Sequence, residues 1–131
     1  MTPDPDISPS RQSLWTVWVL RVVITITAVL MFDQAVFAGQ FLWGVYPALA
    51  IHRDMSSVTM VFALLTVVAA VLARWPGHGP RWPIVASVAL LVLTALETFA
   101  GYVALVWLHI PLGVTVIMLT AALAVWAWWK R

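Results

Sequence analysis

Four long apolar runs, each about the length of a membrane crossing, constrain this sequence more than any other feature. Two of the runs, residues 55–73 and 110–129, contain no charged side chain at all. A helix needs about 20 mostly apolar residues to cross the hydrocarbon core of a bilayer. The sequence therefore predicts an all-α, integral membrane four-helix bundle. The predicted spans are residues 14–38, 52–74, 83–106 and 109–129.

The composition agrees with a protein whose surface faces lipid. Of the 131 residues, 63% are hydrophobic and 9% are charged, whereas about a quarter of the residues of a soluble domain are charged. The net charge of +2 is small, and no basic patch is interleaved with aromatics, so nucleic acid is excluded as a partner. The absence of cysteine excludes disulfides, thiolate metal sites, iron–sulfur clusters and c-type heme attachment.

The basic residues predict the orientation in the bilayer, because cytoplasmic loops carry an excess of Lys and Arg. With the N-terminus inside, six of the seven basic side chains fall on or near the cytoplasmic side, and only Arg53 falls outside. Residues 1–13, rich in Pro, Asp and Ser, are expected to form a disordered cytoplasmic tail before one transmembrane domain, residues 14–131. We expect a multi-pass protein of the cell membrane with both termini in the cytoplasm.

The two halves of the chain resemble each other. Phe37-Ala38-Gly39, near the end of the first run, recurs as Phe99-Ala100-Gly101 near the end of the third. Each is followed by an aromatic-rich connection and then by a histidine. Because parallel repeats are common in membrane proteins, we expect two helix hairpins related by an axis along the membrane normal. The repeat requires the first run as a span, and this favours a span over a cleaved signal peptide.

His52 and His109 are the candidate metal ligands, because the repeat makes them begin parallel helices at one depth. Ser56 and Gly113 stand four residues after them, so a small residue lies one turn along each helix. Neutral imidazole is a good iron ligand, and a heme held between helices needs one imidazole from each side. Arg53 suits a heme propionate. We expect heme b at this site; the alternative is that the histidines are ordinary interfacial polar residues.

Two pairs of motifs carry a resemblance to a known family. Residues 96–101 and 108–113 resemble the second half of a family of small actinobacterial four-helix membrane proteins of unassigned function. Residues 34–39 and His52-Arg53 resemble its first half. The arrangement is also similar to one four-helix half of heme A synthase, and this resemblance implies that His52 and His109 hold heme. The chain has four predicted helices where that enzyme has eight, and it lacks a cysteine pair.

Three polar side chains within the apolar runs are further candidates: Asp33, Gln34 and Glu97. Keeping an ionised group inside a bilayer costs on the order of 3 kcal/mol or more, so such a group marks a candidate functional site. We expect Glu97 to face the bundle, where it shares a proton with Asp33 or bonds a histidine. A neutral carboxyl that bonds a neighbouring helix is the alternative. Arg21 is expected to extend to the cytoplasmic interface.

Three functions fit these features. The leading hypothesis is a heme-b-binding bundle for electron transfer or heme handling. The second is a cofactor-free accessory or scaffold subunit, and the third is a small proton-coupled transporter. No nucleophile–base pair, phosphate loop or metallohydrolase spacing occurs in the sequence, so we expect no catalytic activity of its own. The expected partners are the lipid bilayer and either a larger membrane complex or further copies of this chain.

Overall fold

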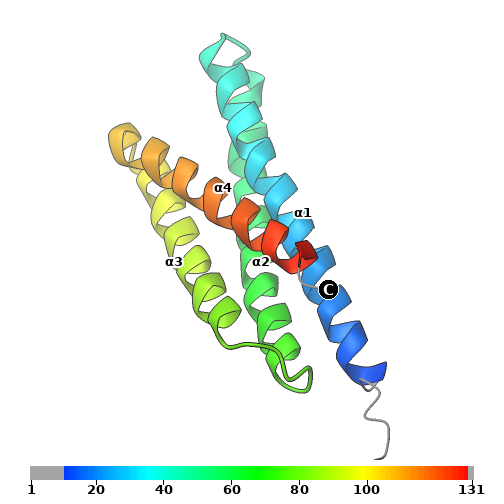
Figure 1. The fold of residues 1–131 in the computed structure, drawn as a ribbon. Helices are drawn as coiled ribbons and strands as arrows, with labels where there is room; N and C mark the ends of the chain where they lie inside the picture. The colour runs from blue at the N-terminus through cyan, green and yellow to red at the C-terminus, as the bar shows by residue number, and fades with distance from the viewer. Residues whose placement is uncertain (1–10, 130–131) are drawn as a thin grey trace, which may run out of the picture.

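The fold consists of four long helices, as a computed structural model of the chain describes it for residues 11–129 (Figure 1). No strand occurs within those residues. All four helices are long and apolar enough to cross a membrane, so the chain is an all-α, multi-pass membrane protein. Residues 1–10 of the predicted tail lie outside the described part of the chain. The helices are α1 (Arg11–Leu42), α2 (Pro47–Arg74), α3 (Trp82–Tyr102) and α4 (Val106–Trp129).

The helix boundaries differ from the predicted spans mainly at the two connections nearest the histidines. Only residues 43–46 separate α1 from α2, although the aromatic segment 39–51 was expected to be a longer connection. Gly44, whose φ is +95°, makes this short turn, and Pro47 at the helix start supplies the φ that α2 needs. As a result His52 lies in the second turn of α2.

The second connection is as short as the first. α3 ends at Tyr102 and α4 begins at Val106, so three residues join them, and Ala104 among these has a φ of 58°. His109 therefore lies in the first turn of α4. Both connections are too short to cover a ligand, so any ligand has to be enclosed by the helices themselves.

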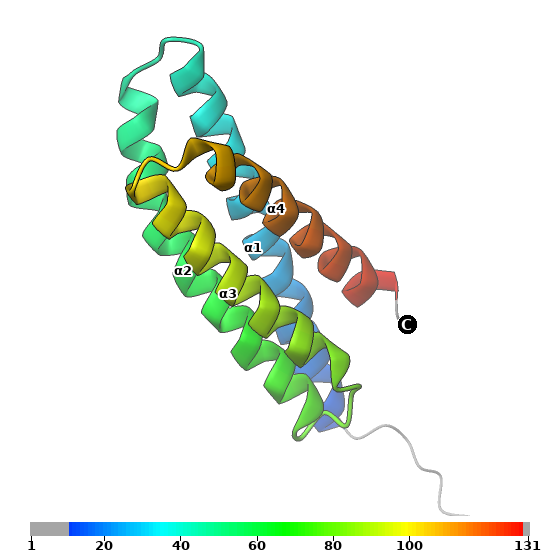
Figure 2. The same ribbon diagram turned by 90° about the vertical axis from the view of Figure 1, so that its left-hand side faces the viewer.

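Each helix packs against two of the others. α1 packs against α2 and α4, and α3 packs against α4 and α2, so α1 lies diagonal to α3, and α2 to α4. The α1–α2 and α3–α4 connections point the same way (Figures 1 and 2). We call this end of the bundle the histidine end. The opposite end, toward which α1 begins, α4 ends and the α2–α3 loop lies, is the terminal end.

The interior combines small and hydroxyl-bearing side chains with a few larger apolar ones such as Ile24 and Leu90, while most large apolar side chains face outward to lipid. Small residues let membrane helices approach closely. Most of the buried hydroxyls donate to the carbonyl one turn earlier, as Thr94 does to Leu90 O at 2.8 Å. Thr27 and Thr66 also bond each other across α1 and α2 at 2.9 Å. The buried polar residues are Thr16, Thr27, Thr59, Thr66, Ser87, Thr94 and Thr120.

An arginine and two indoles fasten α4 to α1 at the terminal end. Arg21 Nε donates to Ala127 O at 2.8 Å, and Trp128 Nε1 donates to Thr25 Oγ1 at 2.9 Å. The guanidinium carbon lies 5.4 Å from the Trp18 ring centroid and 5.3 Å from that of Trp128. A cation is favourable both over an indole and at a helix C-terminus. Arg21 therefore holds two helices together rather than serving only as an interfacial anchor.

Candidate functional site

A cavity with two lobes occupies the histidine end. The larger lobe has a volume of about 270 Å³ and is lined by residues of all four helices. The smaller lobe, of about 230 Å³, extends to Arg53 and Tyr102. Both lobes are lined by His52, Glu97 and His109. A void near the terminal end has a volume of only about 10 Å³, so the space for a ligand is at the histidine end.

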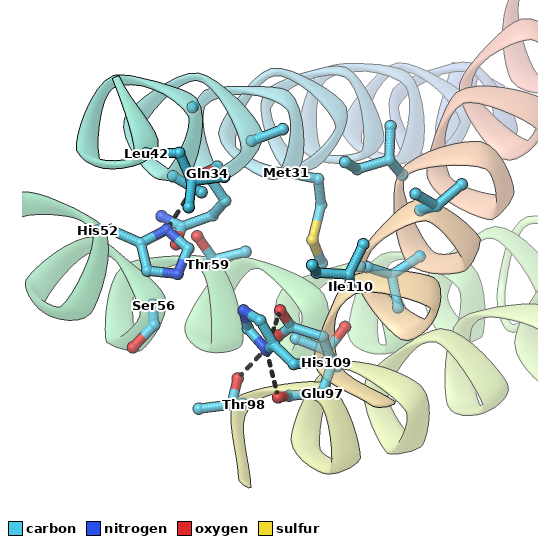
Figure 3. A pocket seen from close by; sticks show the side chains of 18 residues that line it. Met31, Gln34, Leu42, His52, Ser56, Thr59, Glu97, Thr98, His109 and Ile110 are labelled. Carbon is cyan, nitrogen blue, oxygen red and sulfur yellow. Dashed lines mark hydrogen bonds and ion pairs between the residues drawn. The ribbon is translucent and has the colours of Figure 1, made fainter. Parts of the chain in front are cut away.

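His52 and His109 face each other across this cavity. They come from α2 and α4, which are diagonal helices without direct backbone contact. The centroids of the two imidazole rings are 6.0 Å apart, and the ring planes are nearly perpendicular, at 87°. In Figure 3, the ring nitrogen of each imidazole that carries no dashed line points toward the other ring. The structure thus brings together the two histidines that the sequence picks out.

Both imidazoles are held by the same kind of hydrogen bond. His52 Nδ1 lies 3.0 Å from the main-chain oxygen of Gln34, and His109 Nδ1 lies 2.9 Å from that of Glu97. A carbonyl oxygen can only accept, so Nδ1 carries the hydrogen and donates in both rings. In the neutral ring Nε2 then keeps a free lone pair. Metal-binding histidines are commonly oriented by such a bond from their other ring nitrogen.

Glu97 makes the surroundings of the two histidines different. Its Oε1 lies 3.0 Å from His109 Nδ1, and its side chain is 17% exposed. The Thr98 hydroxyl donates to the other carboxylate oxygen at 3.4 Å. Glu97 faces the bundle interior, as expected from the sequence. A carboxylate behind an imidazole strengthens the ring as a metal ligand. Of the two histidines, His109 would therefore be the stronger metal ligand.

Gly101 leaves the space that the His109 ring occupies. A Cβ atom on Gly101 would lie 2.9 Å from both Nδ1 and Cε1 of His109, too close for any side chain without moving the ring. A Cβ on Gly39, the equivalent residue of the repeat, would meet nothing within 4 Å. Gly101 belongs to the repeated Phe-Ala-Gly motif, but the repeat alone does not predict its contact with His109.

Some of the remaining predicted site residues line the cavity and others do not. Gln34 lines both lobes, and its side-chain Nε2 is buried without a hydrogen-bond partner among the described residues. Ser56 also lines both lobes, and its hydroxyl donates to Arg53 O at 2.6 Å. The Arg53 side chain lines only the smaller lobe. Asp33 lines neither lobe. Of the two predicted partners of Glu97, the structure therefore shows the histidine and not Asp33.

Gly113 and a stripe on α1 supply the small residues of the larger lobe. A Cβ on Gly113 would lie 3.7 Å from Glu97 Oε1, in ordinary contact. Ala35, Ala38 and Gly39 line the same lobe from α1. This wall was not predicted from the sequence, because the predicted ligands lie on α2 and α4. The spacing of three and four residues between small side chains is the signal that could have found it.

The donor set limits what the cavity can hold. Within residues 11–129 no group of three or more His, Cys, Asp and Glu side chains is placed to hold a metal ion. Two facing imidazoles instead suit a metal that arrives with its other ligands, as in a macrocycle. Comparison with protein-family models, curated protein sequences and solved structures finds no match to this chain. The resemblances suggested by the sequence therefore remain predictions, and the function has to be argued from the site.

Proposed function

We propose that this protein binds heme b between its helices, with His52 and His109 as the two axial ligands. The spacing of the imidazoles carries the proposal, because their ring centroids are 6.0 Å apart. Two metal–nitrogen bonds of about 2 Å, and about 1 Å from each nitrogen to its ring centre, give about 6 Å between centroids. The perpendicular rings are compatible with this, since rotating a ring about its metal–nitrogen bond leaves the bond length unchanged.

The walls of the cavity also support a flat, mostly apolar ligand. Ligand sites in proteins have volumes of about 300–1000 Å³, with apolar walls and a few well-placed polar groups. The two lobes, of about 270 and 230 Å³, flank the histidine pair and share several lining residues. Alanine, glycine and branched apolar residues make up half of the residues that line the larger lobe. The four hydroxyl groups that line this lobe all donate to protein oxygens. The residues present therefore fit heme b.

Heme b held by His52 and His109 would supply one-electron redox chemistry. The chain's own residues do the positioning. The main-chain oxygens of Gln34 and Glu97 hold both rings with Nε2 toward the cavity. The Glu97 carboxylate makes His109 the more basic ligand. We propose electron transfer or heme handling as the function.

The orientation is part of the proposal. Six of the seven basic residues lie on or near the side of the chain ends and the α2–α3 loop, which supports placing the terminal end in the cytoplasm. Because the chain has no cysteine, single cysteines give a clean test. We expect an impermeant thiol reagent to label Tyr46→Cys on intact cells and to label His78→Cys only after lysis. The reverse pattern would overturn the orientation.

The visible spectrum tests the heme proposal directly. The purified protein, supplied with heme and then reduced, should show the sharp bands of low-spin heme. His52→Ala and His109→Ala should each lose those bands, because each removes one axial ligand. His78→Ala is the matched control, since His78 lies in the α2–α3 loop and lines neither lobe. Heme addition that leaves the wild-type spectrum as that of free heme would falsify the proposal.

A further inference from the structure

Gln34 is a cavity-lining residue whose side-chain amide nitrogen is buried and has no acceptor among the described residues. Buried donors are almost always paired in folded proteins, so an unpaired donor calls for an explanation. A hydrocarbon environment makes the need greater, because lipid offers no acceptor. The amide therefore points to an acceptor carried by a ligand.

The hydrogen bond that orients His52 leaves this side chain available. His52 Nδ1 donates to the main-chain oxygen of Gln34, and that oxygen remains whatever the side chain is. The amide group can therefore be replaced without removing the bond that holds the ring. The role of the side chain and the role of the main chain at this residue can be tested separately.

The chemistry of heme b, which rests on the proposed function, identifies the acceptor. Its four pyrrole nitrogens are bound to iron, and its methyl and vinyl groups accept no hydrogen bond. The two propionate carboxylates are its acceptors, and an amide N–H bonds a carboxylate strongly because the acceptor is charged. Arg53, a cation, lines the smaller lobe together with Gln34. We propose that Gln34 recognises a propionate of the bound heme, and that the carboxylate edge lies toward this lobe.

Two iron porphyrins with and without carboxylates test the inference. Wild type and Gln34→Leu would be titrated in detergent with iron protoporphyrin IX and with iron octaethylporphyrin, which has only alkyl substituents. Gln34→Leu should weaken binding of iron protoporphyrin IX about tenfold, the size expected for a hydrogen bond to a charged group. Its effect on iron octaethylporphyrin should be less than about twofold. Gln40→Leu, on the same helix and exposed outside both lobes, should change neither affinity.

The outcomes separate the inference from the proposed function. If Gln34→Leu binds both porphyrins more weakly by the same factor, the leucine acts through its shape. If it binds both as tightly as the wild type does, the amide does not contact a propionate. Either result overturns the inference while the low-spin spectrum leaves the heme proposal intact. If the wild type forms no low-spin complex with either porphyrin, the proposed function fails and the inference fails with it.

Discussion

The polar groups at the histidine end and at the terminal end of the bundle differ in what they contact. At the terminal end, Arg21 and Trp128 bond groups on the neighbouring helix, and the void between the helices is only about 10 Å³. At the histidine end, one ring nitrogen each of His52 and His109 points toward the other ring beside a cavity of about 270 Å³, and the buried amide nitrogen of Gln34 has no partner among the described residues. The polar groups that join helices at the terminal end bond protein atoms, although Arg74 Nε at that end is also buried without a partner among the described residues. The polar groups at the histidine end lie beside a cavity large enough for a ligand. Damage to one end should therefore affect stability, and damage to the other should affect binding.

The largest effect on binding, apart from loss of a histidine, is expected for Gly101→Ala. The new Cβ would lie 2.9 Å from two atoms of the His109 ring, so the ring has to move out of line. We expect heme affinity to fall about 100-fold, or about 2.7 kcal/mol, as measured by spectral titration. Gln40→Leu is the control, because Gln40 is exposed and lines neither lobe. Equal losses in both variants would contradict the role of Gly101.

At the terminal end, Arg21→Met should destabilise the protein by about 2 kcal/mol, because it removes a charged hydrogen bond and two cation–π contacts. Denaturant unfolding in detergent micelles would measure the change. The heme spectrum should be unchanged, since Arg21 lines neither lobe of the cavity. A shifted spectrum with unchanged stability would show that the two ends are not independent.

Glu97→Gln is expected to change the redox properties while the fold is kept. The amide oxygen can still accept from His109 Nδ1, but the negative charge behind the ring is lost. His109 then donates less to iron, and ferric heme is less stabilised. We expect the reduction potential to rise by on the order of 60 mV, equivalent to about 1.4 kcal/mol for one electron. Potentiometric titration would check this, and a fall in potential would contradict it.

Glu97→Leu is the matched variant for the same site. It removes the acceptor as well as the charge, so His109 keeps only its bond to the main-chain oxygen of residue 97. We expect this variant to be less stable than Glu97→Gln and to bind heme more weakly. Equal stability of the two variants would mean that the carboxyl group has no part in holding the ring.

The smallest effect is expected for Thr66→Val, midway between the two ends. It removes the 2.9 Å bond between Thr27 and Thr66 but keeps nearly the same volume. Hydrogen bonds between membrane helices contribute about 0.6 kcal/mol on average, so stability should fall by about 0.5–1 kcal/mol. Thr115→Val is the control, because Thr115 is exposed and bonds only within α4. A loss as large as that of Arg21→Met would contradict the ranking.

The sequence by itself determines the four helices. A segment inside lipid has to satisfy its own backbone hydrogen bonds, so each long apolar run becomes a helix whatever packs beside it. The same reasoning predicts that His52 and His109 lie at one level, because equal positions on parallel helices have equal depth. It also predicts that Glu97 faces inward, because Ser87, Leu90 and Thr94 share its helix face at spacings of three and four residues. All three are buried in the structure. These conclusions need only the local pattern.

Only the tertiary structure decides which polar groups meet at the cavity. Asp33 and Gln34 are neighbours in sequence, yet Gln34 lines the cavity and Asp33 does not. Successive residues of a helix point about 100° apart, and the bilayer sets their depth but not their direction. The direction follows from which helices pack against α1. The contact of Gly101 with His109, and the main-chain partners of both histidines, likewise depend on how the two hairpins dock.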